Sequence, residues 1–159
     1  MTARLTVGTV VVRLTPWGPV FAAHFHPRCR LDGELRLTTA GGGIEQNEPV
    51  HQAAKREVYE EYGPSCTDGK PLCIEAQPLG PDPMNNGHKT YLWCLVVLPT
   101  PTIIIPNPAE VYAPGWYGGR GGLDHMLSLM SMAKREMFRS ALREALRDPR
   151  LRPYAGLLQ

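Results

Sequence analysis

The sequence predicts an α/β fold in which a mixed β-sheet lies between helices. Three observations predict it: valine-rich strand patterns near the N-terminus, an amphipathic helical pattern after residue 49, and a second helical stripe near the C-terminus. A near-continuous apolar run at 91–98 is typical of a strand that is covered on both faces. Strands before, between and after two helices therefore indicate a sheet with helices on each side.

The first half of the chain supplies three strands and one helix. Residues 5–14 and 20–26 predict a hairpin across the turn at 15–19, and 35–37 predict a short strand. In 49–62 apolar side chains recur at spacings of three and four, which predicts a helix. We expect Asn47 to be its N-cap, Pro49 to lie in its first turn, and Gly63 with Pro64 to end it.

The second half contains the remaining elements. Residues 72–76, 91–98 and 102–105 predict strands, and the proline-rich segment 78–88 predicts a loop. We expect 114–122 to be a second, glycine-rich loop. Residues 130–146 carry one apolar stripe of a long C-terminal helix.

Length and composition exclude several classes of protein. The chain of 159 residues fits one domain, 1–159, and its 43% apolar and 20% charged residues are those of a globular protein. A net charge of +2 gives no support for nucleic-acid binding. The longest apolar run, 92–98, is far shorter than the roughly 20 residues of a bilayer span, so no membrane partner is expected.

The cysteine pattern and the first residues bear on the compartment. The N-terminus has no apolar signal segment, and the four cysteines form no C-x-x-C pair. Reduced thiols are the expected state of such cysteines. We therefore expect a cytoplasmic protein.

Three glutamates at the end of the first helix predict a chemical site. Glu57, Glu60 and Glu61 are three, four and one residues apart, so we expect their carboxylates to converge. Like charges at these spacings cost about 0.2–0.5 kcal/mol each, and anions at a helix C-terminus oppose its dipole by roughly 0.3–1 kcal/mol. Lys55 and Arg56 offset part of this. A solvated helix end would explain the pattern, and so would a hard divalent cation, most simply Mg²⁺.

A triple glycine, Gly41-Gly42-Gly43, strengthens the second explanation. Glycine lets the backbone approach a ligand closely or adopt a positive φ. A glycine segment beside a carboxylate helix suits a metal-bound pyrophosphate, because the cation neutralises the diphosphate and fixed oxygens position an attacking water.

The segment from Gly42 to Pro64 resembles the Nudix box, G-x5-E-x7-R-E-U-x-E-E-x-G-U, where U is aliphatic. All spacings are intact, and Pro64 at the final aliphatic position is the one departure. The matching residues are Gly42, Glu48, Arg56, Glu57, Val58, Glu60, Glu61 and Gly63.

The resemblance implies an α/β/α Nudix sandwich and assigns roles within it. Metal ligands for Mg²⁺ or Mn²⁺ would be Glu57, Glu60, Glu61 and the carbonyl of Gly41. Arg56 would orient a helix glutamate, and Glu48 would help to fix the loop–helix–loop. The general base would be a helix glutamate such as Glu60 or a carboxylate from a later loop, for which Glu110 is the first candidate and Asp124 the second.

The resemblance also implies hydrolysis of a nucleoside diphosphate linked to another group. Dinucleoside polyphosphates, ADP-ribose and nucleoside triphosphates are the substrate classes, and the small net charge favours a nucleotide over a diphosphoinositol polyphosphate, which stays an alternative. A non-hydrolysing nucleotide sensor is a further alternative. Candidate substrate-binding residues outside the box are Lys89, Trp116 and Arg120. Family members are often dimers, so a homodimer stays open.

Overall fold

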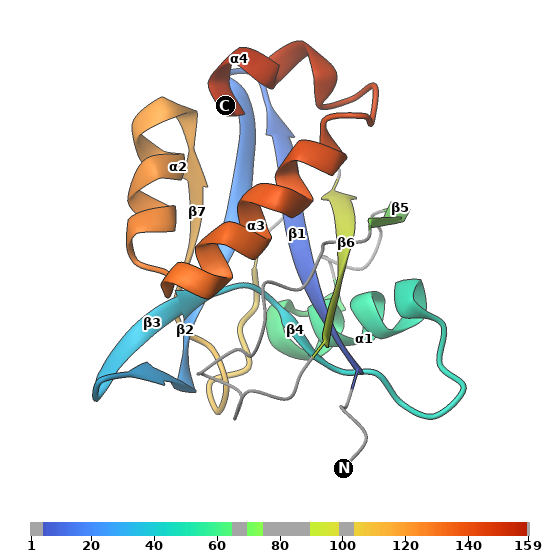
Figure 1. The fold of residues 1–159 in the computed structure, drawn as a ribbon, viewed down its shortest axis with the longest axis vertical. Helices are drawn as coiled ribbons and strands as arrows, with labels where there is room; N and C mark the ends of the chain where they lie inside the picture. The colour runs from blue at the N-terminus through green and yellow to red at the C-terminus, as the bar shows by residue number, and fades with distance from the viewer. Residues whose placement is uncertain (1–4, 65–69, 75–89, 99–103, 159) are drawn as a thin grey trace.

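The computed structural model describes residues 5–64, 70–74, 90–98 and 104–158. In this part of the chain seven strands form one sheet that lies between helices (Figure 1). No helix there is both long and apolar enough to cross a membrane.

The sheet is mixed because β1 and β6 run parallel and the other paired strands run antiparallel. Its order is β3-β2-β1-β6-β5, with β4 beside β1 and β7 beside β2. The strands are β1 (Leu5–Thr15), β2 (Gly18–Leu31), β3 (Glu34–Thr38), β4 (Gly41–Gly43), β5 (Lys70–Ile74), β6 (Thr90–Leu98) and β7 (Tyr112–Gly118).

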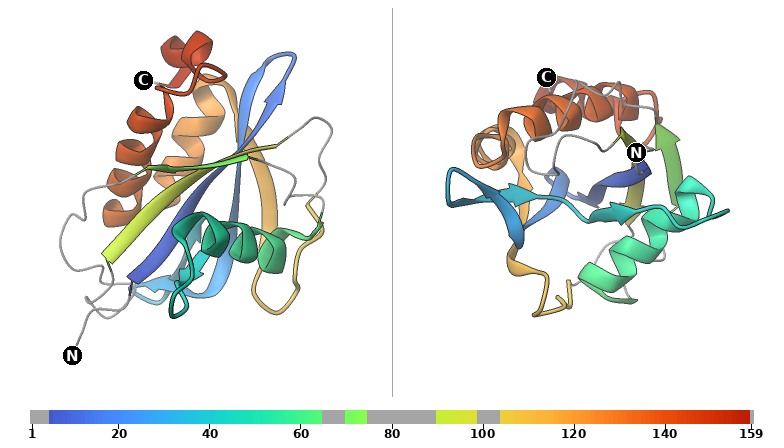
Figure 2. Two further views of the ribbon diagram at one scale, coloured as in Figure 1. Left: turned by 90° about the vertical axis from the view of Figure 1, so that its right-hand side faces the viewer. Right: turned by 60° about the horizontal axis from the view of Figure 1, so that its bottom comes forward.

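Helices cover both faces of the sheet. Helix α1 (Val50–Tyr62) lies on one face, and α2 (Gly119–Ser128) and α3 (Met132–Ala145) lie on the other (Figure 2, left). A 3-10 turn, η3 (Arg152–Tyr154), and α4 (Ala155–Leu158) close the end near the β1–β2 hairpin. The α/β/α arrangement expected from the sequence is confirmed.

Alternation along β1 divides the core into two sides. Val10 and Val12 face α2 and α3 in a large cluster that includes Phe138. Val7 and Val11 face α1 and pack in two smaller clusters, as the period of two along a strand requires. The sheet therefore separates the main apolar core from the side that carries the box helix.

Several elements follow the sequence prediction. The first hairpin, the strand at Glu34–Thr38, the box helix and the C-terminal helix α3 are confirmed. Strands β5 and β6 lie at the predicted segments, and β6 has a neighbour on each side. The predicted loop at 78–88 lies outside the described residues.

Three expectations are wrong. Pro49 rather than Asn47 occupies the N-cap of α1, and Asn47 takes a left-handed conformation (φ 62°) that asparagine tolerates well. Segment 114–122 is not a loop, because it forms the end of β7 and the start of α2. The strand expected at 102–105 is wrong at its described residues, because Ile104 and Ile105 belong to no strand, and residues 102–103 lie outside the described part of the chain.

Candidate functional site

Helix α1 presents its carboxylates through the way its apolar side packs. Ala53, Ala54, Val58 and Tyr62 are fully buried against the sheet. Glu57 and Glu61 flank that stripe, so they are buried too, with exposed fractions of 8% and 5%. Glu60 lies further round the helix and its side chain is 48% exposed. The three carboxylates therefore have different environments.

Arg56 on α1 is the centre of a network of ion pairs and hydrogen bonds. Its Nε and Nη2 donate to the two carboxylate oxygens of Glu48, at 2.9 and 3.0 Å. Nη1 donates to Oε1 of Glu57 at 2.7 Å and to Oε2 of Glu60 at 3.3 Å. Nη2 also donates to the carbonyl of Gly43 at 2.9 Å, which ties the helix to β4.

The pKa values of two carboxylates in this network are shifted in opposite directions, for different reasons. The hydrogen bonds from Arg56 and from the backbone N–H of Glu45 lower the pKa of Glu48 to about 2. Burial raises the pKa of Glu57 above its usual value, although Arg56 opposes that shift. Glu48 is therefore firmly charged, and Glu57 is a carboxylate whose charge the protein only partly compensates.

The glycines of β4 bring backbone against the helix. They pair with β1, Gly41 opposite Gly8 and Gly42 opposite Val7. A Cβ on Gly42 would lie 2.5 Å from Oε1 of Glu57, so glycine is required there by close approach. None of the three has the positive φ that the sequence left open.

Glu61 faces away from Arg56. Its Oε1 accepts the backbone N–H of Gly41 at 3.3 Å, and its Oε2 lies 3.0 Å from Nε2 of His24 on β2. Glu48, Glu57 and Glu60 are thus gathered around one guanidinium, whereas Glu61 has a separate environment. The expected convergence of the three helix carboxylates is only partial.

Glu110 lies in a turn that is attached to the end of α1. The backbone N–H of Ile105 donates to the carbonyl of Tyr62, and that of Asn107 donates to the carbonyl of Glu61. His26 on β2 is within electrostatic range of both Glu61 and Glu110, and both act to raise its pKa, although burial lowers it overall. Glu110 is exposed and lies on the same side of the sheet as the box helix.

The structure describes two of the three candidate substrate-binding residues outside the box, Trp116 and Arg120. Trp116 lies in β7 opposite Ala22, packs at the edge of the α1-side core, and carries the guanidinium of Arg13 at 4.6 Å from its ring centre. Arg120 is the second residue of α2, and Lys89 lies outside the described residues. Asp124, the second choice for the outside carboxylate, is on α2 across the sheet from α1 and is not near the box.

Sequence reasoning missed two histidines. His24 and His26 are two residues apart on β2 and so share the face that α1 covers. The His-x-His spacing within the predicted strand at 20–26 was the signal that could have found them.

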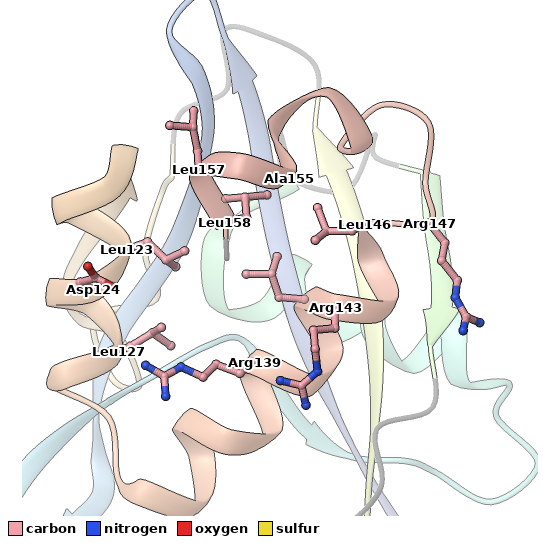
Figure 3. A pocket seen from close by; sticks show the side chains of 11 residues that line it. Leu123, Asp124, Leu127, Arg139, Arg143, Leu146, Arg147, Ala155, Leu157 and Leu158 are labelled. Carbon is pink, nitrogen blue, oxygen red and sulfur yellow. The ribbon is translucent and has the colours of Figure 1, made fainter.

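A cavity of about 770 Å³ lies on the other side of the sheet, between α2, α3 and α4 (Figure 3). Leucines such as Leu123 and Leu127 line it, together with Arg139 and Arg143 of α3 and Arg147, which follows the end of α3. It contains no residue of the box. The cavity is therefore separate from the carboxylate site.

Comparisons with solved structures decide the fold. The chain matches a Nudix hydrolase from M. smegmatis with a TM-score of 0.70 and 14% identity, over 94% of this chain and 89% of that one. This chain has the Nudix fold.

Other Nudix structures give the same result. An Ap4A hydrolase from C. elegans matches with a TM-score of 0.61 and 17% identity over 89% of this chain and 97% of that one. The E. coli dihydroneopterin triphosphate pyrophosphohydrolase matches with a TM-score of 0.64 and 16% identity over 91% and 99%. No family model and no curated protein sequence matches the chain.

Proposed function

We propose that this chain is a metal-dependent pyrophosphohydrolase that cleaves a phosphoanhydride bond in a nucleoside diphosphate linked to another group. The observation that carries the proposal is the box helix itself. Arg56 holds three carboxylates against a glycine strand, and a fourth carboxylate, Glu61, is buried beside them. The Nudix fold of the chain supports the proposal.

The residues present fit a hard divalent cation. No group of three or more acidic, histidine or cysteine side chains in the described part of the chain is arranged as a finished metal site. The donor set nevertheless consists of oxygen atoms, two of the carboxylates are buried, and Gly42 leaves space that any Cβ would fill. Glu57, Glu60, Glu61 and the carbonyl of Gly41 would hold Mg²⁺ or Mn²⁺.

Bound at these oxygens, the cation would neutralise the diphosphate and polarise the bond that breaks. The chain's own residues do the positioning. Arg56 fixes Glu57 and Glu60 through one nitrogen, Nη1, so their relative placement does not depend on flexible side chains alone. Glu48 locks that guanidinium from the other side.

Glu110 is the proposed general base. Its turn is fixed to the last residues of α1, and its exposed side chain accepts a long contact, 3.5 Å, from the side-chain amide of Asn107. An exposed carboxylate on a turn anchored to the helix can reach a water above the site. Replacement by glutamine should lower kcat with little change in KM.

The remainder of the substrate is a nucleotide in this proposal. Ap4A, dihydroneopterin triphosphate and ADP-ribose are named for solved structures with this fold, which supports a phosphoanhydride substrate with a nucleoside-like part. Lys89, Trp116 and Arg120 are the proposed contacts outside the box. The ring of Trp116 already carries Arg13 on one side, so a base would stack at the remaining surface.

The proposal is tested with a panel of dinucleoside polyphosphates, ADP-ribose, nucleoside triphosphates and an inositol pyrophosphate, assayed for phosphate or nucleotide release with Mg²⁺ or Mn²⁺. We expect turnover of at least one nucleotide, its loss in excess EDTA, and its loss by several orders of magnitude in Glu61→Gln. Full activity in EDTA would contradict the metal assignment. Tight binding without turnover across the panel would favour the sensor alternative.

A further inference from the structure

His24 is a fully buried imidazole between the sheet and the end of the box helix. Its Nδ1 lies 2.7 Å from the hydroxyl of Tyr62, and its Nε2 lies 3.0 Å from Oε2 of Glu61. The His24 and Tyr62 rings meet edge to face, with centres 5.3 Å apart and planes at 90°. Tyr62 is itself fully buried, so the ring of His24 has little freedom to turn.

The position of His24 would suit an apolar side chain. Ala22 precedes it on the same face of β2, and Val58 and Tyr62 of α1 belong to the apolar cluster on that face, all of them without solvent exposure. Burying a polar ring in such surroundings is unfavourable unless its nitrogen atoms find partners. The partners that it finds are Tyr62 and Glu61.

The contact with Glu61 is close but not fully aligned. Although Oε2 is 3.0 Å away, the hydrogen on Nε2 does not point well enough at it to form a hydrogen bond. The other oxygen of Glu61 is held by the backbone N–H of Gly41. Glu61 is thus confined between the backbone of β4 and the imidazole of His24.

We propose that His24 is a positioning residue for Glu61, and that Tyr62 positions His24. In this arrangement the Tyr62 hydroxyl donates to Nδ1, which leaves the hydrogen on Nε2, the nitrogen that lies 3.0 Å from Oε2 of Glu61. This role rests on the proposed function, because it gives Glu61 the task of holding the divalent cation. It requires a hydrogen on Nε2, which is the tautomer that a Tyr62 hydroxyl donating to Nδ1 selects.

Two substitutions separate the two nitrogen atoms. Asparagine places its amide where Nδ1 lies and reaches Tyr62 but not Glu61, whereas glutamine places its amide nitrogen near Nε2 and reaches Glu61. We expect His24→Asn to weaken Mn²⁺ binding, measured by the free-Mn²⁺ signal in electron paramagnetic resonance, by about 10–100-fold, and to lower kcat in parallel. His24→Gln should stay within about threefold of the wild type, since it keeps the donor that acts on Glu61.

Tyr62→Phe is the second variant, because it keeps the buried ring and removes the hydroxyl alone. It should weaken Mn²⁺ binding by a smaller factor than His24→Asn, and it keeps the proposal testable if a histidine variant fails to fold. His125→Asn, on an exposed position of α2 across the sheet, is the control for substitution as such.

Equal Mn²⁺ affinity in His24→Asn and His24→Gln would overturn the proposal, as would wild-type affinity in both His24→Asn and Tyr62→Phe. Failure of the proposed function has a different signature, in which the wild type itself binds no Mn²⁺ or Glu61→Gln binds it normally. If the wild type binds Mn²⁺, Glu61→Gln does not, and His24→Asn does, only the role of His24 is rejected.

Discussion

The side chain of Arg56 uses every N–H that a guanidinium carries. Its five donors reach Glu48 twice, Glu57, Glu60 and the carbonyl of Gly43. Because these acceptors lie in different directions around the side chain, they require a planar group whose N–H donors have fixed directions. A lysine ammonium has fewer donors and lacks that geometry. The residue therefore organises the site by shape as well as by charge.

Arg56→Lys should consequently reduce both stability and activity. We expect the free energy of unfolding, measured by urea titration, to fall by about 1–3 kcal/mol, because several charge-assisted hydrogen bonds are lost in a part-buried setting. Arg147→Lys is the matched control, since Arg147 is 79% exposed and pairs with Glu144 at 2.9 Å. It should change stability by less than about 0.5 kcal/mol. Equal losses in the two variants would contradict the central role of Arg56.

Glu48 makes stability depend on pH in acid. Its folded-state pKa of about 2 lies below the ordinary value of 4.5, so the folded protein binds a proton there less readily than the unfolded chain. The stabilisation is therefore fully present above pH 4.5 and is lost as the pH falls towards 2. Urea titrations between these limits should show wild type and Glu48→Gln converging in stability as the pH falls.

The control for that titration is Glu34→Gln, because Glu34 is 76% exposed and contacts Arg36 at 3.5 Å. Its difference from the wild type should stay small across the same range. A constant gap between wild type and Glu48→Gln would show that the ion pair with Arg56 does not cause the shift.

At the scale of the elements, β4 can lie close to the carboxylate of Glu57 because its residues are glycines, which have no side chain. Gly42→Ala would place a Cβ 2.5–2.6 Å from the carboxylate of Glu57 and force that group to move. We expect hydrolysis and Mn²⁺ affinity to fall by about tenfold or more, since displacement of a site group by about 1 Å has effects of that size. Gly156→Ala in α4, where an added Cβ meets nothing within 4 Å, should leave both unchanged.

The sequence predicted the elements whose local pattern and tertiary packing agree. In the first hairpin, β1 has buried valines on both faces. Helix α1 has its apolar residues at helical spacing, and Gly63 at its end has a positive φ of 90°. The box spacing also located Arg56 and its carboxylates, because all of them are on one helix or just before it.

It failed where tertiary pairing overrides local preference. β7 contains Pro114 and two glycines, which are poor strand formers, yet pairing with the long β2 holds it extended. Its start is irregular, with Ala113 at φ 45° beside a shift in register. Helix α2 begins with glycines, which are poor helix formers, so its apolar stripe was not recognised in the sequence. The stripe consists of Leu123, Met126 and Leu127. The partnership of His24 with Glu61 joins a strand to a helix far along the chain, which no local pattern contains.

At the scale of the whole molecule, the large apolar cluster and the carboxylate site lie on opposite faces of the sheet. The largest apolar cluster is on the α2–α3 side, where Phe138 meets Phe21 edge to face with ring centres 5.9 Å apart. The carboxylates are on the α1 side. A change in the large cluster should therefore affect unfolding without altering the folded site.

Phe138→Leu tests this separation. We expect it to lower the free energy of unfolding by about 1–3 kcal/mol through loss of packed volume, while kcat and Mn²⁺ affinity of the folded protein stay at wild-type values. Met132→Leu, at a position that is 74% exposed, should affect neither property. A fall in Mn²⁺ affinity in Phe138→Leu, measured well below its unfolding transition, would show that the two faces are coupled.

The parallel pairing of β1 with β6 also governs the order in which the chain can fold. Leu5 lies opposite Thr90 and Arg13 opposite Leu98, so the paired residues are 85 positions apart in the sequence (90 − 5). During synthesis β1, β2 and α1 leave the ribosome well before β6. Until β6 follows, the edge of β1 that pairs with it has no partner strand. Because distant pairings slow folding, closure of this pair is the step that we expect to limit the rate. Until it closes, the valine-rich edge of β1 is open to strands of other chains, which makes the nascent protein most prone to aggregate at that stage.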